Sequence, residues 1–172
     1  MVHSAAAPER SDEDDDLYDP LTGLPGRLLQ RAHLVHALKR AGRNGTKVAV
    51  LFLDVDDFRS LNDQIGPEAA DEVLIVLAAR IQTSLRDTDM TARLDADEFV
   101  VVCEDVQHDD DLEVLRRRVT DAVSLPMRVG EHTIDLRLSV GAVVGSGAER
   151  AGELLHAADL RMAEAKGSRH AS

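Results

Sequence analysis

The stretch Arg93-Leu94-Asp95-Ala96-Asp97-Glu98-Phe99 decides the fold, because it lies between two short apolar runs. Residues 91–94 and 99–103 have the character of strands, and the second is a near-continuous apolar run, typical of a strand buried on both faces. Tight hairpin turns usually carry Gly, Asn or Asp, because some turn positions need a positive φ. The sequence therefore predicts a β-hairpin with Asp95 and Ala96 in its turn and three carboxylates in the four residues at its tip.

A second acidic cluster follows another apolar run. Asp54, Asp56 and Asp57 come directly after the predicted strand 48–53. If the two strands are neighbours in one sheet, Asp54 and Asp97 converge near its edge. Carboxylates that converge at strand ends are typical ligands of a hard cation that holds phosphate groups. For Asp-Ala-Asp-Glu taken alone, a solvated acidic turn is the alternative.

Composition limits the class of protein. The chain has 172 residues, enough for one domain with a full core. With 20 Lys and Arg against 32 Asp and Glu, the net charge of −12 argues against a general nucleic-acid binder or a membrane-surface binder, and we expect no basic stripe. The sequence lacks a bilayer-spanning apolar run and a signal-peptide pattern, so we expect a cytoplasmic protein. The single cysteine, Cys103, is expected in the core of a protein from a reducing compartment.

The expected domain organisation is an acidic, disordered tail over residues 1–18 and one folded domain over residues 19–170. The Pro- and Gly-containing segment 19–26 is expected to form a structured loop tied to the core. Apolar spacing predicts helices at 27–41, 67–86, 109–124 and 149–165, and alternation predicts a strand at 134–140. The fold class is therefore α/β, a central and mostly antiparallel sheet flanked by helices.

The ordered set of motifs resembles the GGDEF family, the diguanylate cyclase domain that condenses two GTP into cyclic di-GMP. The resemblance implies a fold similar to adenylate cyclases and polymerase palms. It covers residues 19–169 and rests on these motifs in this order: Asp19-x-Leu21-Thr22-Gly23-Leu24, Asp54-x-Asp56-x-Phe58-Arg59-x-x-Asn62-Asp63 with Gly66 and Asp71, Arg86-x-x-Asp89, Asp97-Glu98-Phe99, Ser139-Val140-Gly141, and Ala158-Asp159 with Ala165-Lys166.

The resemblance implies a metal site and a catalytic centre. Asp54, Asp97 and the carbonyl of Val55 would hold Mg²⁺ on the GTP phosphates, and Glu98 would help position the site. Hard oxygen ligands suit magnesium, and the metal would stabilise charge on the transferring phosphorus.

The resemblance also implies a guanine site and a phosphate site. Asn62 and Asp71 would hydrogen-bond the guanine. Lys166 would reach the triphosphate, and backbone donors around Asp57 and Phe58 would cradle it. The attacking hydroxyl would come from a second GTP on a second protomer, so the resemblance implies a homodimer.

Arg86 and Asp89 resemble the family's inhibitory site, which binds the product cyclic di-GMP. A guanidinium can fork onto a guanine or phosphate edge, and a carboxylate can accept guanine N–H groups. Arg-x-x-Asp also occurs by chance, so a solvated helix end is the alternative for this motif.

Asp95 and Ala96 replace the two hairpin glycines of the family. If the second position needs a positive φ, its Cβ costs about 1 kcal/mol, and Asp95 adds negative charge beside a triphosphate. Lys166 is also one residue nearer to Arg169 than in the family pattern. We therefore favour a degenerate member that binds GTP or cyclic di-GMP with weakened or lost cyclase activity. An active cyclase and an interaction module that binds no nucleotide are the alternatives.

Overall fold

The computed structural model describes residues 17–170. Most of the predicted tail lies outside these residues. Leu17 and Tyr18, which the sequence assigned to the tail, belong to the structured loop: Gly26 N–H donates to Leu17 O at 2.7 Å, and Tyr18 forms a β-bridge with Pro25. No helix of the described chain is both long enough and apolar enough to cross a bilayer.

The predicted alternation of helices and strands is confirmed, with added elements. In chain order the elements are α2 (Arg27–Asn44), β1 (Lys47–Val55), α3 (Phe58–Ile65), α4 (Pro67–Thr83), β2 (Met90–Arg93), β3 (Glu98–Val106), α5 (Asp111–Ser124), β4 (Met127–Val129), β5 (His132–Ile134), β6 (Leu138–Gly145) and α6 (Ala151–His170).

The central sheet has the strand order β2-β3-β1-β6, and each neighbouring pair is antiparallel. β1 lies between two partners and is buried along almost its whole length, which explains its unbroken apolar sequence. β4 and β5 form a separate two-stranded sheet. The predicted antiparallel α/β fold is therefore confirmed.

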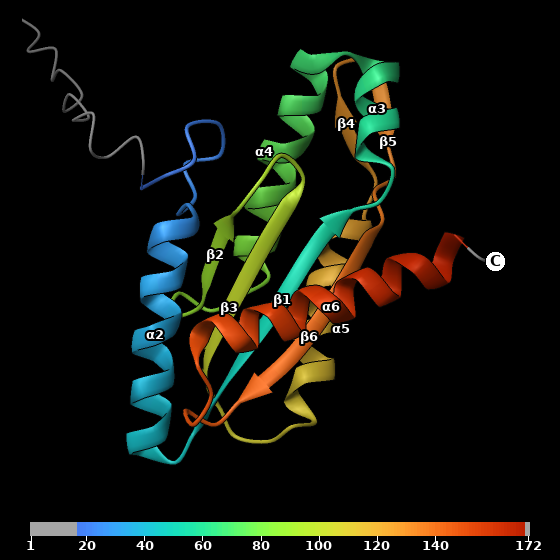
Figure 1. Ribbon diagram of the computed structural model, residues 1–172. Helices are drawn as coiled ribbons and strands as arrows, with labels where there is room; N and C mark the ends of the chain where they lie inside the picture. The colour runs from blue at the N-terminus through green and yellow to red at the C-terminus, as the bar shows by residue number, and fades with distance from the viewer. Residues whose placement is uncertain (1–16, 171–172) are drawn as a thin grey trace, which may run out of the picture.

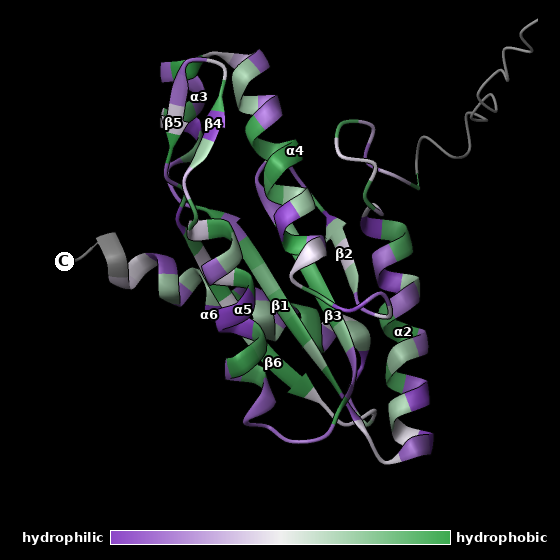
Figure 2. Ribbon diagram, turned by 180° about the vertical axis from the view of Figure 1, so that it is seen from behind, coloured by the Kyte–Doolittle hydropathy of each residue, from purple (hydrophilic) through white to green (hydrophobic). Residues whose placement is uncertain are grey.

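Helices cover both faces of the sheet and make three layers, with α2 and α6 on one face and α4 and α5 on the other (Figure 1). Alternate residues of β1 belong to different cores. Val48, Val50 and Phe52 pack with α2 and α6, while Ala49 and Leu51 pack with α4 and α5. Viewed from behind, the strands of the central sheet are largely hydrophobic, and purple bands mark the polar residues of the helices (Figure 2).

Gly141 allows α6 to lie unusually close to β6. A Cβ at this position would overlap the backbone carbonyl of Ala158 and the backbone nitrogen of Met162. Only a residue without a side chain fits there, because backbone atoms cannot move aside as a flexible side chain can. The Ser-Val-Gly motif thus sets the separation between strand and helix.

Three parts of the chain differ from the prediction. Residues 58–65, for which no element was predicted between the strand 48–53 and the helix 67–86, form α3. The strand predicted at 134–140 is divided between β5 and β6, because Arg137 uses its carbonyl to accept a hydrogen bond from Asp56 N–H at 2.9 Å. The last helix, predicted to end at residue 165, continues through Gly167 to His170.

Candidate functional site

The two acidic clusters meet where β1 runs beside the hairpin. In the β1–β3 register Asp54 faces Glu98, and Val55 N–H donates to Asp97 O at 3.2 Å. β1 and β3 are direct neighbours in the sheet, which is the condition under which Asp54 and Asp97 were expected to converge. The acidic tip of the hairpin is therefore part of a larger site and is not an isolated solvated turn.

Lys166 reaches this site from the other end of the chain. Its Nζ lies 2.5 Å from Asp54 Oδ1, and the Asp54 residue is only 6% exposed. Asp54 follows Phe52 by two positions, so it lies on the same face of the sheet as α6, which carries Lys166. The hydrogen bond to Asp54 raises the pKa of Lys166. The ion pair between Lys166 and Asp54 therefore places the lysine ammonium group beside the carboxylates.

Asp97 and Glu98 hold their protons more tightly than usual. Burial, and then the negative charge of Asp54, raises the pKa of Asp97. Burial raises the pKa of Glu98 as well, with further contributions from Asp54, Asp95 and Asp159. The carboxylates therefore form a crowded, half-buried region of negative potential.

This donor set fits a divalent cation that is shared with a phosphate ligand. No group of three or more His, Cys, Asp or Glu side chains suited to a metal ion occurs in residues 17–170. Asp54 and Asp97 offer carboxylates and Val55 offers its carbonyl, which leaves other positions to water or phosphate oxygens. Mg²⁺ is typically held in this way, by one or two carboxylates together with substrate phosphates.

The loop after β1 is held in one conformation. Ser139 is fully buried, and its hydroxyl donates to Asp56 Oδ1 at 2.5 Å. Asp57 then adopts a left-handed conformation with φ 55°, and α3 begins at Phe58, which is 8% exposed. A left-handed residue costs energy outside glycine, so the surrounding contacts must hold it. The backbone around Asp57 and Phe58 is thus set at the edge of the acidic site.

Asn62 and Asp71 lie on two helices that pack against each other, α3 and α4. Gly66 separates the helices with a φ of 87°, a conformation that favours glycine. Asn62 is half-buried and Asp71 is exposed. Within residues 17–170, neither side chain is hydrogen-bonded or ion-paired to Asp54 or Asp97, so their predicted contact with guanine stays a prediction.

Arg93 holds the tip of the hairpin. Its guanidinium donates to the carbonyls of Asp95 and Ala96 at 3.2 and 2.7 Å, and it pairs with Asp19 at 3.0 Å. Among the described residues outside glycine, only Asp57 and Asp105 have a positive φ. The backbone cost considered for Asp95 and Ala96 therefore does not arise, because this turn is built without left-handed residues.

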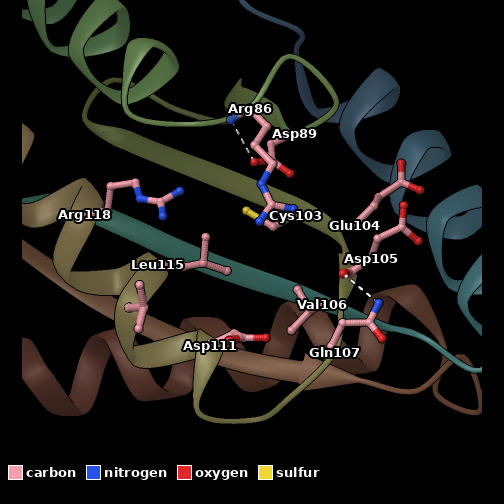
Figure 3. A pocket seen from close by; sticks show the side chains of 11 residues that line it. Arg86, Asp89, Cys103, Glu104, Asp105, Val106, Gln107, Asp111, Leu115 and Arg118 are labelled. Atoms are coloured by element: carbon pink, nitrogen blue, oxygen red, sulfur yellow. Dashed lines mark hydrogen bonds between the residues drawn. The ribbon is translucent and has the colours of Figure 1, made fainter.

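A second site lies at the other end of the hairpin. Arg86 and Asp89 line a cavity of about 240 Å³, together with Cys103 of β3 and Arg118 of α5 (Figure 3). Arg86 N–H donates to Asp89 Oδ2 at 3.0 Å, while the buried Asp89 Oδ1 has no partner within the part of the chain described. The Arg-x-x-Asp motif therefore lines a cavity.

Arg118 was not identified from the sequence, because one Arg among the three consecutive arginines of α5 carries no distinguishing pattern. Its neighbours Arg116 and Arg117 pair with Glu113 at 2.7 and 2.9 Å, whereas Arg118 lines the cavity. Glu104, an acid at the same cavity, is paired with Arg40 of α2 at 2.9 Å. The cavity thus combines two guanidinium groups with the carboxylates of Asp89, Asp105 and Asp111.

The Cys103 thiol faces this cavity from the core. Burial, and then the negative charge of Asp89, raises the pKa of Cys103, and the residue is 2% exposed. A neutral, buried thiol of this kind behaves as a small apolar group. The expectation that Cys103 is a core residue is confirmed.

The chain is similar to known proteins in both sequence and fold. The sequence profile of the family described as diguanylate cyclase, GGDEF domain, matches residues 16–171. The diguanylate cyclase TpbB of Pseudomonas aeruginosa is 35% identical over 158 residues, which cover 88% of this chain and 36% of that protein. This chain therefore spans about a third of the length of that relative.

Solved structures show the same fold. The GGDEF domain of TpbB (YfiN) from P. aeruginosa superposes with a TM-score of 0.84 and 34% identity, over 88% of this chain and 89% of that one. A microbial GGDEF domain whose structure describes a novel interaction mode with cyclic di-GMP superposes with a TM-score of 0.76 and 26% identity, over 88% and 91% of the two chains.

We predict that Asp95→Asn lowers the pKa of both Asp97 and Glu98. The Asp95 charge raises both values, so its removal makes the ionised forms easier to reach. Carboxyl-detected NMR titration measures the two values directly. Asp87→Asn, at an exposed position before β2, serves as the matched control. Equal values in parent and Asp95→Asn, or a rise, would contradict the electrostatic picture of the hairpin.

Proposed function

Because this chain belongs to the GGDEF family, we propose that it binds guanine nucleotides in cyclic di-GMP signalling and that its cyclase activity is weakened or lost. The observation that carries this proposal is the junction of Asp54 and Asp97 at the end of β1, with Lys166 beside it. Two carboxylates and a lysine form a suitable arrangement for a metal-bound triphosphate.

The acidic pair would hold Mg²⁺ with the Val55 carbonyl. When bound, the metal supplies positive charge to the phosphates and to the phosphorus under attack. Lys166, from α6, would exchange its contact with Asp54 for a phosphate oxygen. Glu98 occupies the adjacent register position and would help orient the site.

Recognition of the base and the phosphates would use the loop and helices after β1. Asn62 on α3 would hydrogen-bond the guanine, and Asp71 on α4 would accept from its N–H groups. The backbone at Asp57 and Phe58 would donate to phosphate oxygens. The second GTP would come from a second protomer, so catalysis would require a homodimer.

The hairpin supports weakened catalysis for reasons other than backbone strain. The Ala96 Cβ would occupy space that a glycine leaves for substrate. The Asp95 carboxylate adds charge to a region where the pKa of Asp97 is already raised. Both effects would act on the triphosphate. An active cyclase, in which this turn is tolerated, is the alternative outcome of the assay described next.

We predict that the double variant Asp95→Gly/Ala96→Gly makes cyclic di-GMP from GTP at least about tenfold faster than the parent, which corresponds to about 1.4 kcal/mol in the barrier. Chromatographic detection of the product in magnesium buffer measures the rate, and Asp97→Ala is the inactive control. Parent activity equal to that of the double variant would mean that the turn is tolerated. Inactivity of both would assign the defect to another part of the protein.

We further propose that the cavity at Arg86 binds cyclic di-GMP. Two guanidinium groups suit guanine and phosphate edges, and the Asp89 carboxylate can accept hydrogen bonds from guanine N–H groups. The structure of a related GGDEF domain with cyclic di-GMP supports this choice of ligand.

We predict that Arg86→Ala and Arg118→Ala each weaken cyclic di-GMP binding by about tenfold or more, because each removes a charge-assisted hydrogen bond of about 1.5–3 kcal/mol. Isothermal titration calorimetry provides the measurement. Arg117→Ala removes an arginine from the same helix outside the cavity and should bind like the parent. Binding that survives in both cavity variants would exclude this site. Absence of heat with cyclic di-GMP and also with GTP and magnesium would favour an interaction module.

A further inference from the structure

A histidine lies in the contact between α2 and β3. His33 Nε2 is 3.2 Å from Glu104 Oε1, and the two side chains are 23% and 14% exposed. The Nε2 atom is buried, yet it makes no hydrogen bond within residues 17–170. Buried polar atoms normally have a partner, so this imidazole is an exception that its surroundings must explain.

Arg40 already occupies the carboxylate that His33 approaches. Arg40 Nε donates to Glu104 Oε2 at 2.9 Å, and its Nη2 donates to Oε1 at 2.5 Å, which makes a bidentate pair between the helix and the strand. Glu104 extends from β3 toward α2 (Figure 3). The oxygen nearest to His33 is therefore already bound to a guanidinium, and an imidazolium would have to compete for it.

Helix α2 supplies no negative charge of its own. It holds five Arg or Lys residues and no Asp or Glu, although the chain has a net charge of −12; the five are Arg27, Arg31, Lys39, Arg40 and Arg43. The expectation of no basic stripe is therefore wrong for this helix. A proton on His33 would add to an excess of positive charge.

The charged groups that act on His33 are few. Glu104 of β3 favours its protonated form, while Arg40 and His36 of its own helix oppose it. Within the described residues none comes from β1, β2 or α6, the other elements that contact α2. One carboxylate, which is already paired, therefore faces two positive or titratable groups.

Burial lowers the pKa of His33, and Glu104 only partly compensates for it. In the unfolded chain a histidine takes up a proton as the pH falls through its ordinary value of 6.5, whereas folded His33 does so only at lower pH. The unfolded chain thus binds more protons in this range, and the structure around His33 becomes less stable as the pH falls.

We propose that His33 is a pH-sensitive contact whose protonation weakens the packing of α2 against β3. At neutral pH the uncharged imidazole packs in the interface while Arg40 holds Glu104. In mildly acidic solution an imidazolium in the same place is buried beside Arg40 without a carboxylate of its own. Opening of α2 brings it into water, so proton uptake and opening are linked. The contact requires no metal and no nucleotide, and the chain alone is sufficient to test it.

Native-state hydrogen exchange measures this opening element by element. The full chain is followed by ¹⁵N NMR at about pH 7 and about pH 5.5, with correction for intrinsic exchange rates. We expect the protection of α2 amides near His33 to fall by about threefold or more in acid, relative to the amides of α4. His33→Gln keeps a polar side chain that does not titrate and should remove this fall. An equal fall in parent and variant, or higher protection of α2 in acid, would overturn the proposal.

Two further variants distinguish this contact from an ordinary ion pair. Glu104→Gln removes the one negative charge that acts on His33 and should make the fall in acid steeper; if His33 and Glu104 formed a stabilising ion pair, the fall would become shallower, which would contradict the proposal. His36→Gln, at an exposed position one turn along the helix, is the matched control and should retain most of the pH dependence.

A direct titration of the parent keeps the proposal testable even if a variant does not fold. NMR of the imidazole resonances gives the midpoint of His33 in the folded chain and in the chain unfolded by urea. We expect the folded midpoint to be the lower one. A folded midpoint equal to or above that of the unfolded chain would overturn the proposal.

Discussion

The antiparallel pairing of β1 with β3 is the constraint on which the rest of the site depends. Leu53 faces Phe99 and Asp54 faces Glu98, so the last apolar pair is followed at once by the first acidic pair. A slip of one residue would turn every side chain of β1 to the opposite face of the sheet. Because both cores are filled by alternate residues of β1, that slip is strongly disfavoured, and the same packing that stabilises the sheet places Asp54 toward α6.

The position of α6 is the second constraint, and it follows from Gly141. The helix backbone lies where a Cβ at this position would be, so any larger residue would displace the helix from β6. Lys166, carried by this helix, would then move from Asp54. The Ser-Val-Gly motif thus contributes twice, since Ser139 also holds Asp56 in the loop that leads to α3. Residues remote in the chain from Asp54 therefore set the geometry of the proposed nucleotide site.

Much of this arrangement could be predicted from the sequence, because strong patterns specified it. The apolar runs on either side of the Asp95 turn predicted the hairpin. The two acidic clusters indicated that the strand ending at Leu53 lies beside it. Short elements were less predictable: α3 is eight residues long and interrupts a polar segment, and its stability depends on packing against α4. Arg118 was also missed, since the feature that distinguishes it, a cavity, exists only in three dimensions.

The central claim is that Asp54 and Asp97 hold one metal-bound guanine nucleotide. It is tested most directly by adding Mn²⁺ and 3′-deoxy-GTP, which lacks the attacking hydroxyl, to ¹⁵N-labelled protein. Paramagnetic broadening should be strongest at the amides of Val55, Asp97 and Glu98, and Asp54→Ala should abolish it. Broadening centred on another part of the chain, or unchanged in Asp54→Ala, would contradict the account.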